Sequence, residues 1–264
     1  MKKLLSVTIC FIMLMLAFSV SVSAADDLDP VVYVTISAGK GEIELASSPV
    51  FLTDTDGDGL LTIRDALYGA HEIYHENGIS AFGSEVTSYG LSLTKLWGDE
   101  SGAYGYTVNN RSAMSLSDTV KENDKIYAYV YSDKEFYSDC YSFFDKTNAT
   151  LDKDETLDLT LQYQSYAEDF SVVTNPLANA VITVDGERTE FVTDENGKVT
   201  VSGLEKGWHL ISAESDSLVL VPPVMSATVE GGNIGTILLY SAIGVLAVLA
   251  VGVIIVIIKK KKNG

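Results

Sequence analysis

Three aspartates recur at alternate positions in one short stretch of the chain: Asp54, Asp56 and Asp58. If this stretch forms a tight loop, the spacing turns all three carboxylates inward, where they can share one hard cation such as calcium. The alternative is an acidic turn that only caps the helix after it. Because the full spacing pattern is specific, it favours calcium binding.

The residues that follow complete the pattern of a calcium loop over residues 54–65. Gly59 permits a sharp turn after the third carboxylate, and Leu60 would offer its backbone carbonyl. Asp65, twelfth in the loop, would close the ligand shell from the first turn of a helix. The loop resembles those of EF-hands, and its final Asp, followed by Ala66-Leu67, is similar to the dockerin variant. Dockerins carry two such loops and this chain has one, so docking to a cohesin is not implied.

The predicted helix also carries a second possible metal motif. His71-Glu72-Ile73-Tyr74-His75 matches H-E-x-x-H, in which two imidazoles one turn apart bind zinc and the glutamate acts as a general base. The third ligand of the longer protease motif is expected at position 81, which is Ala81. A zinc peptidase that uses His71, Glu72 and His75 is therefore a disfavoured alternative, and chance explains the match better.

Three tyrosines alternate along one predicted strand: Tyr127, Tyr129 and Tyr131. They point to one face of that strand, because successive side chains alternate between faces. Such a ladder could stack against a sugar or a corrin ring, which makes these residues candidate ligand contacts. We expect instead that the aromatic residues between positions 137 and 144 cover them, because exposed aromatic patches of that size are uncommon.

Two apolar segments indicate export and membrane attachment. Residues 1–24 combine a lysine pair, a short apolar run and small residues before a cleavage site, which is typical of a secretory signal peptide. Residues 235–258 contain no charge, and at ~1.5 Å per residue they can cross a ~30 Å hydrocarbon core. The lysines of residues 259–264 then stay on the cytoplasmic side. We expect a single-pass plasma-membrane protein with an extracellular N-terminal part and a short hinge at residues 230–234.

The part of the chain between these segments is strongly acidic. The signal and the tail take 6 of the 18 basic residues, which leaves 12 against all 36 acidic residues and a net charge of −24. Such a surface repels nucleic acid and anionic lipid, so we expect no nucleic-acid partner. Because Cys10 leaves with the signal, Cys140 has no partner for an internal disulfide.

Apolar periodicity divides the exported part into two domains, the first over residues 25–165. Alternation predicts strands before and after one helix, and the order of two strands, a crossing helix and further strands is that of a β-grasp domain. The inner face of the helix is expected to hold Ala66, Leu67, Ala70 and Tyr74. The predicted elements are strands at about 31–36, 42–45, 91–96, 105–108 and 126–131, and the helix at about 63–76.

Three stretches of this domain resemble the transcobalamin C-terminal-like domain, a β-grasp module of bacterial surface proteins. They are LTKLWG (93–98), GYTVNN (105–110) and VKENDKI (120–126). Asp65-Ala66-Leu67 is similar to the family's helix motif, and Asn110 stands where its hairpin motif has Gly. The resemblance covers roughly a hundred residues, and its motifs are structural. It implies a β-grasp fold and allows cobalamin as a ligand, because the related domain of transcobalamin helps to enclose cobalamin.

The second domain is expected over residues 166–229. Short alternating runs separated by polar turns predict a small antiparallel β-sandwich. The stretch TDENGKVTVSGL (193–204) resembles the carboxypeptidase regulatory-like, or prealbumin-like, modules that serve as spacers on cell-surface proteins.

The sequence therefore predicts an α+β β-grasp domain, then an all-β sandwich and one C-terminal transmembrane helix. The expected function is non-enzymatic: a membrane-anchored bacterial cell-surface protein of the binding or adhesion type, with calcium as a structural ion. A corrinoid-binding protein is the alternative, and the zinc peptidase is the third. The partner would be a surface or matrix component, or a small ligand, whose identity the residues do not give.

Overall fold

A five-stranded mixed sheet opens the part of the chain that the computed structural model describes, residues 29–38 and 41–231. Its strands are β1 (Val31–Ala38), β2 (Glu42–Phe51), β5 (Tyr104–Val108), β6 (Arg111–Ser112) and β7 (Lys125–Val130). They lie in the order β2-β1-β7-β5-β6, with β1 parallel to β7 and antiparallel to β2. Because side chains alternate along a strand, Val32, Val34 and Ile36 of β1 share one face, and all three are fully buried.

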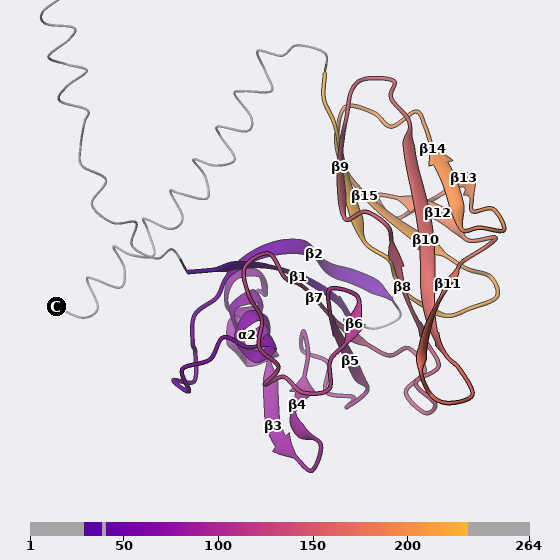
Figure 1. The fold of residues 1–264 in the computed structure, drawn as a ribbon. Coiled ribbons are helices and arrows are strands. Elements are labelled where there is room, and N and C mark those ends of the chain that lie inside the picture. Colours follow the sequence, from indigo (N-terminus) through magenta and orange to yellow (C-terminus); the bar gives the residue numbers. More distant parts are fainter. Residues whose placement is uncertain (1–28, 39–40, 232–264) are drawn as a thin grey trace, which may run out of the picture.

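One α-helix, α2 (Ile63–Tyr74), covers this face of the sheet (Figure 1). The sequence places the helix correctly but not all of its inner face. Tyr74 lies at the surface, whereas His71 is fully buried. The apolar helix residues that join the core of the sheet are Ile63, Ala66, Leu67 and Ala70.

A short 3-10 helix, η1 (Gly78–Ala81), follows α2 and leads into a separate hairpin. The hairpin consists of β3 (Gly83–Thr87) and β4 (Gly90–Lys95), which pair only with each other in the described part of the chain. Leu93 and Leu96 anchor its base in the core beneath α2. Its turn projects into solvent, where Val86 and Tyr89 are exposed.

Two further sheets pack face to face around a second core. The first runs β11-β10-β8-β16, with β14 also paired to β10, and the second runs β13-β12-β15-β17-β9. Their inner faces contribute Leu157, Leu161, Ile182, Ile211 and Met225 to one apolar cluster. The strands are β8 (Cys140–Phe144), β9 (Asn148–Leu151), β10 (Leu157–Tyr166), β11 (Val172–Pro176), β12 (Val181–Val184), β13 (Glu187–Val192), β14 (Lys198–Val201), β15 (Gly207–Glu214), β16 (Leu220–Val221) and β17 (Met225–Val229).

Three strands of this sandwich come from the segment that the sequence assigned to the first domain. β8 pairs with β10 and with β16, β9 pairs with β17, and β10 pairs with β11 and β14. Residues 140–166 thus hydrogen-bond with strands that follow residue 166. The prediction over residues 25–165 and 166–229 did not anticipate these pairings.

The predicted fold class, an α+β β-grasp domain with a sandwich and a transmembrane helix, is wrong for this structure. The described residues are 49% strand and 8% helix, in a β-sandwich-like arrangement with α2 as their one α-helix. The physical reason is that many short strands in residues 140–229 outweigh one helix of 12 residues. Residues 29–38 and 41–231 contain no helix with the length and the apolar character that a membrane span requires. The predicted signal (1–24), the apolar segment (235–258), the basic tail (259–264) and most of the hinge (230–234) lie outside the described residues.

Candidate functional site

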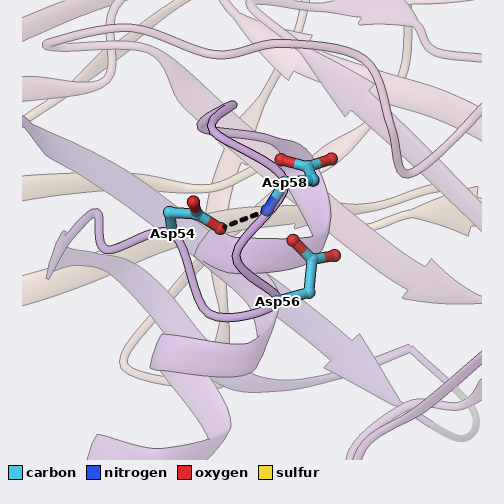
Figure 2. Close-up of side chains that lie close together, drawn as sticks. All are labelled: Asp54, Asp56 and Asp58. Atoms are coloured by element: carbon cyan, nitrogen blue, oxygen red, sulfur yellow. Dashed lines mark hydrogen bonds between the residues drawn. The ribbon is translucent and has the colours of Figure 1, made fainter.

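The three alternate aspartates converge in the loop between β2 and α2 (Figure 2). Asp54, Asp56 and Asp58 each offer a carboxylate oxygen, and these oxygens lie within 4.8 Å of one another. Asp56 and Asp58 are exposed and Asp54 is half-buried, so the group opens to solvent. Three carboxylates at this separation repel one another, and an all-oxygen set of this kind suits a hard divalent cation.

Asp54 organises the backbone of this loop. Its Oδ1 accepts the N–H groups of Gly57 at 2.7 Å and Asp58 at 3.2 Å, and its Oδ2 accepts that of Gly59 at 2.9 Å. The bond from Gly59 contributes most to holding the pKa of Asp54 below its ordinary value. Gly57 and Gly59 have φ angles of 77° and 85°, where a side chain would be strained. The loop is thus folded around one carboxylate. The next backbone N–H, that of Leu60, donates to Asp58 Oδ1 at 2.8 Å.

Asp65, the predicted closing ligand, does not join the three carboxylates. It is 1% exposed, and its two oxygens accept four hydrogen bonds from two threonines. Oδ1 accepts from the backbone N–H and the hydroxyl of Thr55, while Oδ2 accepts from those of Thr62. With Thr62 as N-cap, this is a capping box that starts α2. Asp65 therefore ties the loop to the helix.

Arg64 is a functional neighbour of the loop that sequence reasoning missed. Its Nη1 lies 3.5 Å from Asp56 Oδ2 and 3.5 Å from Asp65 Oδ1, and it donates to Thr55 Oγ1 at 2.6 Å. The guanidinium also stacks over Tyr68, 5.6 Å from the ring centroid. A fixed cation thus stands between Asp56 and Asp65, where a calcium loop would gather its ligands. Its position directly before the twelfth residue of the loop was the available signal.

Replacing Asp65 with alanine is expected to lower the free energy of unfolding by about 2 kcal/mol, because four donors lose their buried acceptor. The matched control is Asp58→Ala, at an exposed position, which should change stability by less than about 0.5 kcal/mol in chelator. Urea unfolding of both variants measures the difference. Equal stabilities would contradict the role of Asp65 as the connection between loop and helix.

The H-E-x-x-H residues are held in a way that does not prepare a zinc site. His71 Nδ1 lies 2.6 Å from the carbonyl of Leu67, and His71 Nε2 accepts the N–H of Trp97 at 3.0 Å. Nδ1 therefore carries the proton, and the lone pair of Nε2 is already engaged. His75 Nδ1 accepts the N–H of Asn77 at 3.0 Å, and Glu72 points to solvent. His71 acts as a buried connector between the helix and the end of β4.

The tyrosine ladder lies between the first sheet and the sandwich rather than in solvent. Tyr127 and Tyr129 are 7% and 5% exposed and form one cluster with Tyr141 and Val221, which we call the tyrosine junction. The Tyr127 hydroxyl donates to the carbonyl of Pro222 at 2.7 Å. Tyr141 stacks on Tyr129 with centroids 5.9 Å apart and an interplanar angle of 25°.

The contacts at the tyrosine junction leave its rings unavailable to a flat ligand. Burial raises the pKa of Tyr141 to about 12, and its hydroxyl donates to Asn110 Oδ1 at 2.9 Å. Tyr131, at the rim, is half-buried, and its ring centroid lies 5.3 Å from that of Tyr137. The expected cover from residues 137–144 is found for Tyr137, Tyr141 and Phe143, while Phe144 packs in the sandwich core.

No protein-family model matches the chain, and no curated protein matches it. Among solved structures, the chain is similar to one described as "Crystal structure of Dscam1 isoform 4.44, N-terminal four Ig domains", with 9% identity and a TM-score of 0.24. The match covers 79% of this chain and 45% of that one, so the chain spans less than half of that structure's length. At this TM-score the similarity carries no argument about fold or function.

Proposed function

We propose that this chain is an exported cell-surface binding protein in which the loop at Asp54, Asp56 and Asp58 holds calcium as a structural ion. Attachment to the membrane is assigned to residues 235–258, because this stretch contains no charge and is predominantly apolar. The observation that carries the proposal is the convergence of three carboxylates within 4.8 Å in a loop folded around Asp54. Bound calcium would offset the repulsion between these charges.

The loop connects directly to the elements that give the first sheet its shape. Asp65 links Thr55 of the loop to Thr62, the N-cap of α2. α2 in turn covers the core of the sheet. An ion that fixes the loop would therefore stabilise the position of the helix, which is a structural rather than a catalytic role.

The donor set supports a weak calcium site. Three carboxylates are in place, but Asp65 is committed to the capping box and Arg64 already contributes positive charge beside Asp56. Sites with few charged ligands are typical of extracellular modules, which bind calcium with dissociation constants of about 10⁻⁴–10⁻³ M. Such a site would be filled only where calcium is millimolar, as it is outside cells.

Calcium at ten times its dissociation constant is expected to stabilise the full chain by about 1.4 kcal/mol, because the ion binds the folded state alone. Thermal melts in calcium, in magnesium and in chelator measure the shift, and magnesium should act more weakly because it demands octahedral geometry. Asp54→Asn should abolish the response. Asp194→Asn is the matched control, since Asp194 accepts two backbone N–H groups where Asp54 accepts three, but lies on the sandwich.

Two results would count against this proposal. One is a melting temperature that is the same in chelator and in millimolar calcium. The other is a calcium response that survives Asp54→Asn, because the ion would then bind elsewhere on this acidic chain.

A further inference from the structure

Two neighbouring loops expose aromatic side chains at one end of the sandwich. Phe136 and Tyr137, in the connection between β7 and β8, are 74% and 51% exposed. Tyr166 and Phe170, at the turn between β10 and β11, are 72% and 86% exposed. We call these four residues the aromatic tip. Contiguous exposed apolar patches on soluble proteins mark interaction sites.

The pairing of the strands brings the two loops together. β8 and β10 are antiparallel, and their register from Leu161↔Phe144 to Tyr163↔Ser142 carries Tyr166 back alongside the start of β8. Burial raises the pKa of Tyr131, and the nearby phenols of Tyr166 and Tyr137 add to this rise. Figure 1 shows the β7–β8 connection beside the β10–β11 turn.

Both loops are stiffened by aspartates and hold their rings in unusual backbone positions. Asp139 accepts the N–H groups of Ser132 at 2.7 Å and Asp133 at 2.9 Å. Tyr137 has φ 53° and Phe170 has φ 63°, in the left-handed region that glycine and asparagine normally fill. Bulky residues persist in that region where another requirement overrides the strain, and such positions cluster at functional sites. Tyr137 and Phe170 are two of the four residues of the aromatic tip, and both rings are exposed.

The charge around the tip selects the kind of partner. Residues 131–139 and 166–171 contain five acidic residues and one basic residue, Lys134, whose Nζ is paired with Asp99 Oδ2 at 3.2 Å. Asp133, Asp139 and Asp169 accept hydrogen bonds from backbone N–H groups or serine hydroxyls of their own loops, which holds these carboxylates in place. The two loops thus present aromatic faces, which pack against apolar groups and cations, together with negative charge, which attracts cations.

The aromatic tip also faces away from the end where the chain continues toward residue 235. The N–H of Glu230 donates to the carbonyl of Leu151 at 2.9 Å, so the last described residues lie beside the end of β9. After the turn that follows Leu151, β10 runs for ten residues to Tyr166, which is about 33 Å at ~3.3 Å per residue. The tip is therefore at the opposite end of the sandwich (Figure 1).

We propose that the aromatic tip binds a polypeptide segment of another protein that carries lysine or arginine next to apolar residues. Cationic side chains would lie over the exposed rings, and the surrounding carboxylates would attract them. This inference rests on the proposed surface-binding function and names the class of its partner. It does not depend on the calcium loop.

Binding of a synthetic peptide that repeats Lys-Leu-Gly to the full chain tests the proposal, with peptides that carry glutamine or glutamate in place of lysine as probes of charge. The lysine peptide is expected to bind best, and more weakly at high salt. Phe136→Ser combined with Phe170→Ser should weaken its binding by about tenfold or more, as loss of interface anchors does. Tyr89→Ser, at an equally exposed ring on the β3–β4 turn, should leave it unchanged.

Several results would overturn the proposal: no binding of the lysine peptide, equal binding of the glutamine peptide, or equal loss in Tyr89→Ser. Binding of chitohexaose or phosphatidylcholine vesicles through the same rings, without the lysine peptide, would assign the tip to sugar or membrane instead. Melts in calcium on the same samples separate the two proposals. If the peptide binds and calcium does not raise the melting temperature, only the proposed calcium site is contradicted. If calcium raises the melting temperature and the peptide does not bind, only the proposal for the aromatic tip is contradicted.

Discussion

Replacing His71 with alanine is expected to lower the free energy of unfolding by about 4 kcal/mol. The ring is fully buried, so its removal leaves a cavity among α2, Phe82 and Trp97. The N–H of Trp97 also loses the acceptor that it reaches at 3.0 Å. Urea unfolding at neutral pH measures the loss. His75→Ala, one turn further along and only half-buried, is the control and should cost much less.

The same residue should make stability depend on pH. Burial lowers the pKa of His71 to about 4 from an ordinary value of 6.5, and the nearby His75 adds to this effect. The folded state therefore favours neutral His71, so its contribution is complete above pH 6.5 and is lost as the pH falls toward 4. Between these values the slope is up to about 1.4 kcal/mol per pH unit.

Comparison with the variant isolates this titration. The difference in unfolding free energy between the natural chain and His71→Ala should shrink as the pH falls from 6.5 to 4.5. His209 titrates in the opposite sense, because its contact with Asp185 raises its pKa even though burial opposes this. Its contribution is present at low pH and is lost as the pH rises through the raised pKa. If the difference between the natural chain and His71→Ala stays constant between pH 6.5 and pH 4.5, then burial does not lower the pKa of His71.

Gly105→Ala is expected to destabilise the chain by about 3 kcal/mol, although alanine is normally more favourable than glycine in a strand. A Cβ at Gly105 would lie 2.4 Å from Cζ of Tyr129, whose ring rests on the β5 backbone. Neither the backbone of β5 nor the ring of Tyr129 can move easily, because Gly105 pairs with Tyr129 in β7 and Tyr141 stacks on that ring. Thermal and urea unfolding measure the effect.

A double-mutant cycle tests this explanation. Tyr129→Leu removes the ring that meets the new methyl group, so Gly105→Ala should cost much less in a Tyr129→Leu background. The coupling should exceed about 1 kcal/mol. If the losses of unfolding free energy in the two single variants simply add in the double variant, the clash with Tyr129 does not explain the effect of Gly105→Ala.

Local sequence signals predicted the loop and the helix well. The Asp54–Asp58 spacing and the glycines determine a turn within a few residues, and Thr62 with Asp65 marks the helix start. The structure gives Asp65 a capping box instead of the predicted place among the carboxylates, because the same residue type at the same position serves either role. The sequence could not show that the donors of Thr55 and Thr62 would occupy the carboxylate oxygens of Asp65.

The sandwich was predicted only in part, because its pairings are not local. The short alternating runs of residues 166–229 predicted a sandwich, but nothing near β8 or β9 in the sequence identifies β16 and β17 as their partners. The burial of Tyr127 and Tyr129 likewise depends on Val221 and Pro222, about ninety residues away. Short strands whose partners are distant carry weak periodic signals, so the β content of the chain was underestimated.

These distant pairings also determine the order in which the molecule can assemble. A chain is synthesised from its N-terminus, and β9 must wait for β17, just as the outer edge of β8 must wait for β16. High contact order of this kind slows folding. The first sheet and its helix can form while the last strands are still being made. The sandwich and the tyrosine junction are then completed together, by the final twelve described residues, 220–231.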